Sequence, residues 1–311
     1  MKAKIKVEKI AQLNGHLDCI YALENSCQAD SFYSGAGDGF IVEWGSKNST
    51  EGKLISKVFR PVYCLKLLNE KNILLAGTAA GNLHVIDLQK NIELKNIELH
   101  TFGLFDLKTH KNFLVSAGGD GTISILDQTN FSLVHKIIAS DKSARIIAMK
   151  PDGAEFAVGF SDHKIRIYNA ENFELKTTIS QHSNSVFALA YSPDGNYLVS
   201  GGRDAMMNIY DTKNNFELLK NIAAHNLHIH CIYFNTNGKL FATSSMDKTI
   251  KIWDAENFEL LKVIDKSRHE GHVSSVNKLL WLDDENIISC SDDKTIMCFR
   301  TQIVNKLSNL D

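Results

Sequence analysis

The stretch from Ala224 to Ile264, AHNLHIHCIYFNTNGKLFATSSMDKTIKIWDAENFELLKVI, decides how the rest of the chain is interpreted. It contains four short runs rich in Ile, Phe, Thr and Trp, at 229–234, 240–244, 249–253 and 258–264. Such runs, separated by Asn, Gly and Asp, predict four strands of a small antiparallel sheet. Because a sheet of this size cannot bury both of its faces alone, it needs further copies of itself to pack against.

The chain contains seven copies of this pattern. Each copy has a position in the turn between its second and third strands that is held by Asp in all copies but the second. These positions are Asp38, Ala80, Asp120, Asp162, Asp204, Asp247 and Asp293, so successive copies are 40 to 46 residues apart. That spacing is typical of a four-stranded propeller blade.

The polar residues of the quoted stretch carry a resemblance to a known family. His225, Thr243, Asp247 and Trp253, followed by Asp254, match the motif of the WD-repeat β-propeller family, although Ala224 replaces its usual Gly. In that family the indole donates to the hydroxyl, and the imidazole joins the hydroxyl to the carboxylate. The resemblance implies a structural network here, because each such bond contributes about 1 kcal/mol and near-copies recur in other repeats. A catalytic triad is the alternative, but a catalytic site is normally built once.

The same network positions recur elsewhere in the chain. They are His16, Ser34, Asp38 and Trp44 in the first copy, His100, Ser116 and Asp120 in the third, His182, Ser200 and Asp204 in the fifth, and His272, Ser289 and Asp293 in the seventh. The second and fourth copies lack the histidine. We therefore expect these two blades to be held by apolar packing and not by the polar network.

The resemblance implies that residues 1–311 form a single all-β domain, a seven-bladed β-propeller of four-stranded antiparallel blades. The expected blades are 14–56, 57–97, 98–138, 139–179, 180–222, 223–265 and 266–300, followed by a tail at 301–311. In this family the N-terminal strand commonly completes the last blade, and we assign that role to residues 4–12 within 1–13, because closure removes two exposed sheet edges. The alternative is that residues 303–307 take the outer position.

Composition argues against several classes of partner. The chain has 34 Lys and Arg against 36 Asp and Glu, a net charge of −2, so it has no bulk attraction for nucleic acid or for an anionic membrane. No stretch has the length of a membrane span, and the N-terminus does not read as a signal peptide. The six cysteines lack CxxC spacing. We therefore expect these cysteines to be small buried thiols and not disulfides or zinc ligands. Such thiols fit the reducing cytoplasm, so we expect a cytoplasmic protein.

Few residues suggest catalysis or metal binding. The glycine clusters at 35–39 and 118–121 are followed by strands, whereas a phosphate site needs a helix. His228 and His230 point to one face of a strand, with Asp292 in the next blade, while alternation turns Cys231 away. Zinc requires three or four ligands, which nothing in the sequence demands. With no catalytic motif present, we expect no enzyme, no metal and no cofactor.

The resemblance also implies a partner-binding face. In the family, contacts often come from the residues three and five after the histidine position and from the residue before the turn Asp. The residues singled out at these positions are Tyr21, Tyr63, Phe105, Arg145, Phe187, Arg203, His228, His230, Met246, Asn277 and Asp292. Aromatic residues and Arg dominate binding hot spots. The plainer alternative is that the aromatic side chains only fill the mouth of the channel.

We expect the arginines and histidines on one side of the channel mouth, with Phe187 between Arg145 and Arg203. Tyr21, Tyr63 and Phe105 are expected on the opposite side. The function implied is a non-enzymatic protein-interaction scaffold that binds a peptide or protein segment, acidic or carboxylate-bearing, on the top face. Two other functions stay open. One is a small-ligand-binding or enzymatic propeller that uses the channel mouth, and the other is a complex subunit bound through the side or bottom of the ring.

Overall fold

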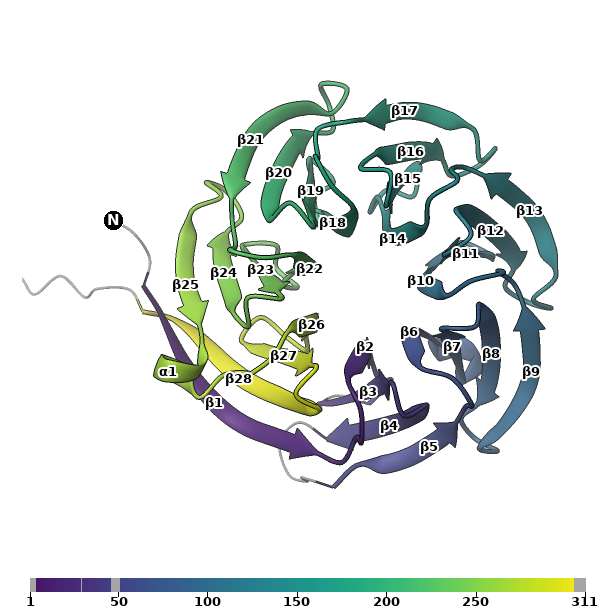
Figure 1. Ribbon diagram of the computed structural model, residues 1–311, viewed down its shortest axis with the longest axis horizontal. Coiled ribbons are helices and arrows are strands. Elements are labelled where there is room, and N and C mark those ends of the chain that lie inside the picture. Colours follow the sequence, from purple (N-terminus) through teal and green to yellow (C-terminus); the bar gives the residue numbers. More distant parts are fainter. Residues whose placement is uncertain (1–3, 29, 46–50, 305–311) are drawn as a thin grey trace, which may run out of the picture.

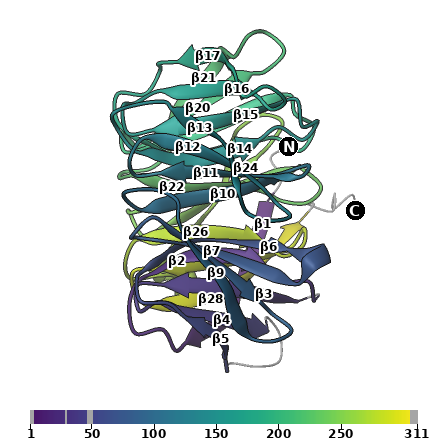
Figure 2. The ribbon, with the colours of Figure 1, turned by 90° about the vertical axis from the view of Figure 1, so that its right-hand side faces the viewer.

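The computed structural model describes residues 4–28, 30–45 and 51–304. Within this part of the chain, seven four-stranded antiparallel sheets are arranged in a ring around a central channel (Figure 1). Figure 2 shows the same ring from its edge. The fold is therefore the expected seven-bladed propeller. None of the helices described is long and apolar enough to cross a membrane.

Each blade runs from an innermost strand at the channel to an outermost strand at the rim. Blades 1 and 2 consist of β2 (Ile20–Asn25), β3 (Ser31–Ala36), β4 (Phe40–Gly45) and β5 (Lys53–Lys57), then β6 (Val62–Leu68), β7 (Ile73–Thr78), β8 (Asn82–Asp87) and β9 (Ile92–Glu98). Blades 3 and 4 consist of β10 (Leu104–His110), β11 (Phe113–Gly118), β12 (Thr122–Asp127) and β13 (Leu133–Ile138), then β14 (Ala144–Met149), β15 (Glu155–Phe160), β16 (Ile165–Asn169) and β17 (Leu175–Ile179).

The remaining blades follow the same order. Blades 5 and 6 consist of β18 (Val186–Tyr191), β19 (Tyr197–Gly202), β20 (Met206–Asp211) and β21 (Glu217–Ala223), then β22 (Ile229–Phe234), β23 (Leu240–Ser245), β24 (Ile250–Asp254) and β25 (Leu260–Ile264). Blade 7 consists of β26 (Val276–Trp281), β27 (Asn286–Ser291), β28 (Thr295–Val304) and β1 (Lys4–Asn14). Two short helices, η1 (Asn69–Lys71) and α1 (Lys266–His269), lie in connections.

The hydrophobic core lies between neighbouring blades. One cluster, for example, joins Leu75 and Leu83 of blade 2 to Leu114 and Leu126 of blade 3. The outermost strands face solvent, as the largely exposed β9 shows. Each blade therefore depends on its neighbours for burial, which is why the sheet needs copies of itself.

The N-terminal strand closes the ring. β1 pairs antiparallel with β28 along its length, and the sheet order is β1-β28-β27-β26. In Figure 1, β1 (purple) lies beside β28 (yellow) at the rim. Ile5 and Leu13 are 5% and 1% exposed, so the strand is anchored near both ends. The expected closure by the N-terminal strand is confirmed.

The expected tail at 301–311 is wrong for its first residues. β28 continues to Val304, and Ile303 pairs with Ile5. Residues 301–304 thus belong to the third strand of blade 7, because their backbone is paired by β1. For the same reason the alternative that gave residues 303–307 the outer position is wrong at 303 and 304. Residues 305–311 lie outside the described part of the chain.

Candidate functional site

The hydrogen-bond networks at the top of the blades hold the loops that surround the channel mouth. In blade 6, His225 Nδ1 lies 2.9 Å from Asp247 Oδ2, and His225 Nε2 lies 2.7 Å from Thr243 Oγ1. Trp253 Nε1 donates to the same hydroxyl at 2.9 Å. Asp247 also accepts from the backbone N–H of Asn226 at 3.0 Å. This set ties the loop before the innermost strand to the turn between the second and third strands.

Four other blades contain the same arrangement, with some substitutions. The shortest histidine–aspartate distances are 3.1 Å for His16–Asp38, 3.1 Å for His100–Asp120, 2.9 Å for His182–Asp204 and 2.9 Å for His272–Asp293. The hydroxyls that face the other imidazole nitrogen are Ser34, Ser116, Ser200 and Ser289. In each of these blades the histidine is buried and both of its ring nitrogens have a hydrogen-bond partner.

We expected blade 4 to be held by apolar packing without the polar network. The structure shows that a different polar network also holds it. Ser140 replaces the histidine and donates to Asp162 Oδ2 at 2.9 Å. Arg166 donates to both oxygens of Asp162, at 3.2 and 2.6 Å. The sequence comparison missed this because the guanidinium reaches the carboxylate from the third strand and not from the histidine position. In blade 2, where Ala80 replaces the Asp, His84 instead pairs with Glu93 at 3.2 Å.

Replacing Asp247 with Ala is expected to lower the free energy of unfolding by about 1–3 kcal/mol, because it leaves the buried His225 without its partner. Urea denaturation measures the loss. Glu256→Ala, which removes an exposed carboxylate from the same blade, is the control and should shift the midpoint little. Equal midpoints for Asp247→Ala and Glu256→Ala would show that the network does not stabilise the blade.

A β-bulge recurs in the innermost strand of every blade. The pairing between the first and second strands skips the second residue of the innermost strand in all seven sheets. The skipped residues are Tyr21, Tyr63, Phe105, Arg145, Phe187, His230 and Asn277. A bulge leaves one residue unpaired and redirects its side chain. The fold therefore presents the side chain of the skipped residue of each blade at the channel mouth.

These side chains surround one cavity of about 480 Å³. Of the eleven residues singled out from the sequence, nine line it, namely Tyr21, Tyr63, Phe105, Arg145, Phe187, His230, Met246, Asn277 and Asp292. The other two do not. Arg203 is exposed on the loop above, and His228 packs beside Phe187 with ring centroids 6.0 Å apart. Arg145 lies between two phenylalanine rings, with its guanidinium carbon 4.3 Å from the Phe105 centroid and 5.7 Å from the Phe187 centroid.

The planar groups form a continuous arc of contacts across six blades. Tyr63 stacks on Phe105 with centroids 5.5 Å apart, and Tyr21 meets Tyr63 edge-on at 5.4 Å. The Arg145 guanidinium lies 4.3 Å from the Phe105 centroid. Farther along, Phe187 stacks on His230 at 5.9 Å with an interplanar angle of 6°. One face of each of Tyr63, Phe105, Phe187 and His230 is therefore in contact with a neighbouring ring.

Burial keeps the histidine of this arc uncharged. Burial, with a smaller contribution from the neighbouring His228, lowers the pKa of His230 to about 4, while Asp292 opposes the shift. His230 Nε2 is buried and has no hydrogen-bond partner among the described residues. A neutral imidazole with a free nitrogen can accept from or donate to a ligand that enters the mouth.

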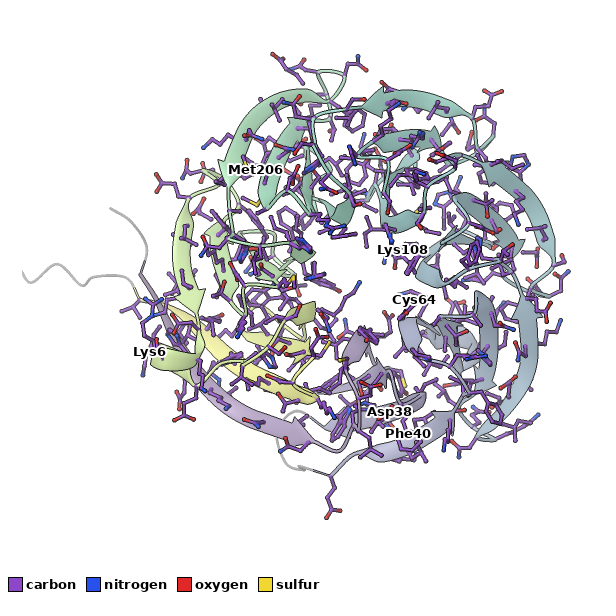
Figure 3. All side chains as sticks on the ribbon, viewed as in Figure 1. Lys6, Asp38, Phe40, Cys64, Lys108 and Met206 are labelled. Atoms are coloured by element: carbon purple, nitrogen blue, oxygen red, sulfur yellow. The ribbon has the colours of Figure 1, made fainter. Side chains whose placement is uncertain are left out.

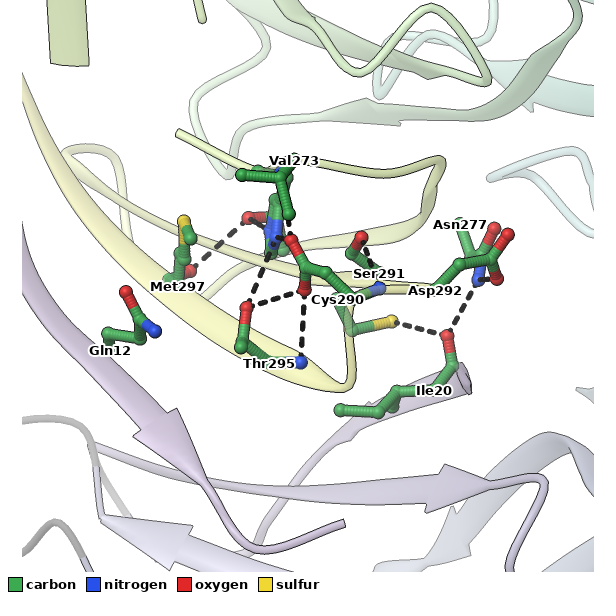
Figure 4. Close-up of polar contacts among 12 residues, drawn as sticks. Gln12, Ile20, Val273, Asn277, Cys290, Ser291, Asp292, Thr295 and Met297 are labelled. Carbon is green, nitrogen blue, oxygen red and sulfur yellow. Dashed lines mark hydrogen bonds and ion pairs between the residues drawn. The ribbon is translucent and has the colours of Figure 1, made fainter. Parts of the chain in front are cut away.

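Blade 7 provides a polar side to the mouth, next to blade 1. Asn277 Nδ2 donates to Asp292 Oδ1 at 2.7 Å and to the carbonyl of Ile20 at 2.9 Å (Figure 4). The thiol of Cys290 donates to the same carbonyl at 3.4 Å. These contacts join the last blade to the first beside the mouth and hold the Asp292 carboxylate in place.

The bulges also bring residues to the channel that the sequence analysis missed. Strict alternation turned Cys231 away from His230, but Cys231 lines the channel below the mouth together with His230. The reason is the bulge, which puts two successive residues on one side. Lys278 reaches both the mouth and the channel in this way. Figure 3 shows Cys64 and Lys108 at the inner edge of the ring, in contrast to Lys6 at the rim.

Cys19 and Ser275 also line the mouth. They occupy the position three after the histidine, where the resemblance implies contacts, although they were not among the eleven residues singled out. Ile146, which follows the bulge, was missed. No group of three or more His, Cys, Asp or Glu side chains that could hold a metal occurs among the described residues.

The comparison with protein families shows to which family the chain is related. Residues 49–300 match the model of the nucleolar protein 10-like, N-terminal domain, a β-propeller family. The chain belongs to this family. The match covers blades 2 to 7, and blade 1 and β1 complete the same ring in the structure. A search of the curated proteins found no match.

Membership of the nucleolar protein 10-like family bears on two expectations. It agrees with the resemblance to WD-repeat-type propellers. It contradicts the cytoplasmic location that we inferred from the cysteines, because the family's description points to the nucleolus. The expectation of buried thiols holds for Cys64, Cys231, Cys290 and Cys298, whereas Cys27 is exposed and Cys19 is half-buried. Free thiols are equally compatible with the nucleus, so the cysteines do not separate the two compartments.

Proposed function

We propose that this nucleolar protein 10-like propeller is a non-enzymatic interaction module that binds a peptide segment of a partner protein at the channel mouth. The observation that carries the proposal is the bulge repeated in all seven blades, which directs one side chain per blade into a single cavity. Three of these are aromatic residues on consecutive blades, Tyr21, Tyr63 and Phe105. Aromatic anchors beside Arg are the residue types that dominate binding energy at protein interfaces.

The size and lining of the cavity favour a binding role over simple filling of the mouth. The side chains of the arc are already in contact with one another, yet about 480 Å³ is left open. If the aromatic residues served only as filler, their contacts would close the mouth, because protein interiors leave few voids larger than a water molecule. A wall of aromatic side chains with a few fixed polar groups suits an extended segment that places one or two side chains in the mouth.

The test is to capture partners from a nuclear extract with wild-type protein and with Phe187→Ala. We expect the affinity of a captured partner to fall by about thirtyfold or more for Phe187→Ala, because a buried anchor contributes about 2 kcal/mol. Arg203→Ala should have a smaller effect, confined to low salt, because Arg203 lies outside the cavity and rim charges act mainly on association rate.

Phe59→Ala is the matched control, since Phe59 is fully exposed on the top face and does not line the cavity. Thermal unfolding of each variant separates lost binding from lost fold. Partners that bind Phe187→Ala as tightly as wild type would contradict a site at the mouth. That result would favour a binding site on the side or bottom of the ring.

A further inference from the structure

Arg145 is held in an unusual setting at the channel mouth. Its guanidinium carbon lies 4.3 Å from the Phe105 centroid on one side and 5.7 Å from the Phe187 centroid on the other. Arg145 Nε donates to Ser161 Oγ at 2.8 Å. In the part of the chain that the structure describes, its two terminal nitrogens make no hydrogen bond or ion pair. The guanidinium is thus clamped by two rings and one hydroxyl, with its outer edge free.

The clamp determines what Arg145 can bind. Two aromatic rings flank the guanidinium, and the N–H donors of its two terminal nitrogens remain available. These donors match the two oxygens of a carboxylate or of a phosphate. Burial lowers the pKa of Arg145, although Tyr63 opposes the shift, but a guanidinium still carries its charge at neutral pH. The Arg145 guanidinium is therefore charged, held in place and without an ion-pair partner among the described residues before a ligand binds.

The other charged groups nearby do not neutralise Arg145. In the channel, Lys66 pairs with Glu24 at 2.7 Å and Lys108 with Asp106 at 3.0 Å. The cavity lining contains two cations, Arg145 and Lys278, against one carboxylate, Asp292, so its formal charge is positive. Asp292 and Lys278 both belong to blade 7, across the ring from β14, which carries Arg145 (Figure 1). Arg145 therefore lies apart from the one carboxylate of the lining.

We propose that Arg145 binds the anionic group of an acidic or phosphorylated residue in the segment that enters the mouth. This rests on the proposed function, since it names the chemistry of the same ligand. The carboxylate or phosphate accepts from the terminal N–H groups of Arg145, close to Phe105 and Phe187. The partner is a protein with an exposed acidic motif.

The experiment uses a displayed library of short random peptides as its probe. Peptides are selected on the wild-type protein, on Arg145→Glu, on Arg145→Gln and on Arg203→Glu. The last variant makes the same change of charge on the neighbouring blade but outside the cavity. Thermal unfolding confirms that each variant is folded, and Arg145→Gln keeps a planar polar group between the rings if Glu proves destabilising.

We expect wild type and Arg203→Glu to select peptides that share an Asp or Glu. Arg145→Glu should lose these peptides by about thirtyfold or more in affinity and select Lys or Arg at that place, because the sign of the charge is reversed. Mouth-dependent peptides that have no acidic residue, or that bind Arg145→Gln equally well, would overturn the inference and leave the proposed function standing. Peptides whose binding is unaffected by Phe187→Ala would overturn both.

Synthetic forms of a selected peptide distinguish the two sources of the anion. The acidic residue is replaced in turn by Gln and by phosphoserine, and affinities are measured by calorimetry. Loss of binding with Gln and retention with either charged form supports recognition of the anion by Arg145. A phosphoserine form that binds more tightly than the acidic form identifies phosphate as the preferred group. Equal binding of the Gln form would overturn the inference.

Discussion

Removing residues 1–13 is expected to destroy most of the stability of this propeller and to cause aggregation. β1 buries Ile5 and Leu13 and pairs with β28 along its length. Fully burying an aliphatic side chain contributes about 1.5–3 kcal/mol, so these two contribute about 3–6 kcal/mol. A typical domain is stable by only about 5–15 kcal/mol. The deletion also exposes the edge of β28, whose unpaired backbone groups are a template for pairing with another chain.

Size-exclusion chromatography and chemical denaturation of the shortened protein measure both effects. Leu13→Ala and Ile10→Ala form a matched pair within β1, because Leu13 is 1% exposed and Ile10 is 38% exposed. We expect Leu13→Ala to cost about 2–5 kcal/mol and Ile10→Ala much less. We also expect deletion of residues 308–311, which lie outside the described part of the chain, to be harmless. A monomeric and fully stable protein without residues 1–13 would show that β1 is dispensable for closure.

The second large effect is a loss of stability in acid. Burial lowers the pKa of His16, His100 and His225 below the ordinary value of 6.5, against the pull of their aspartate partners. As the pH falls below about 6.5, the unfolded chain binds protons at these histidines before the folded chain does. The free energy of unfolding therefore decreases, by up to about 1.4 kcal/mol per pH unit for each histidine.

The aspartates of the same networks add to this loss at lower pH. Although burial opposes it, bonding to His225 and His272 lowers the pKa of Asp247 and Asp293 below the ordinary range. Their contribution is complete above about pH 4 and is lost as the pH falls toward their folded pKa. Denaturation from pH 7 to pH 4 should show a falling midpoint, and His225→Gln should reduce the slope between pH 7 and pH 5. A midpoint independent of pH in this range would contradict neutral, buried histidines.

Much of the fold could be predicted because its signals are local. The spacing of the turn aspartates defined seven repeats, and alternation within each repeat defined the strands. Each histidine–aspartate pair lies within one repeat, about 22 residues apart in blades 1, 5 and 6. The closing strand was predictable for a similar reason, since a ring with two open edges is unfavourable. Nine of the eleven residues chosen for the channel mouth line one cavity because the choice followed repeat position.

The errors have a common origin in contacts that the repeat does not encode. In blade 4, Arg166 took over a network role from a position outside the motif. The cytoplasmic location was inferred from the thiols, but the description of the matching family points to the nucleolus. Alternation turned Cys231 away from the channel, and it gave no reason to place Lys278 there. Both errors arise because alternation assumes a regular strand, and the bulge breaks that regularity.

The sequence by itself determined the number of blades, their strands and the residues at each repeat position, because all of these depend on local spacing and hydrophobic pattern. Only the tertiary structure decided how the bulged side chains meet across blades. Phe105, Arg145 and Phe187 belong to three different repeats, and their stacking requires the curvature of the closed ring. The direction of a side chain follows from strand pairing and from neighbouring blades, and residues in separate repeats become neighbours only when the ring forms.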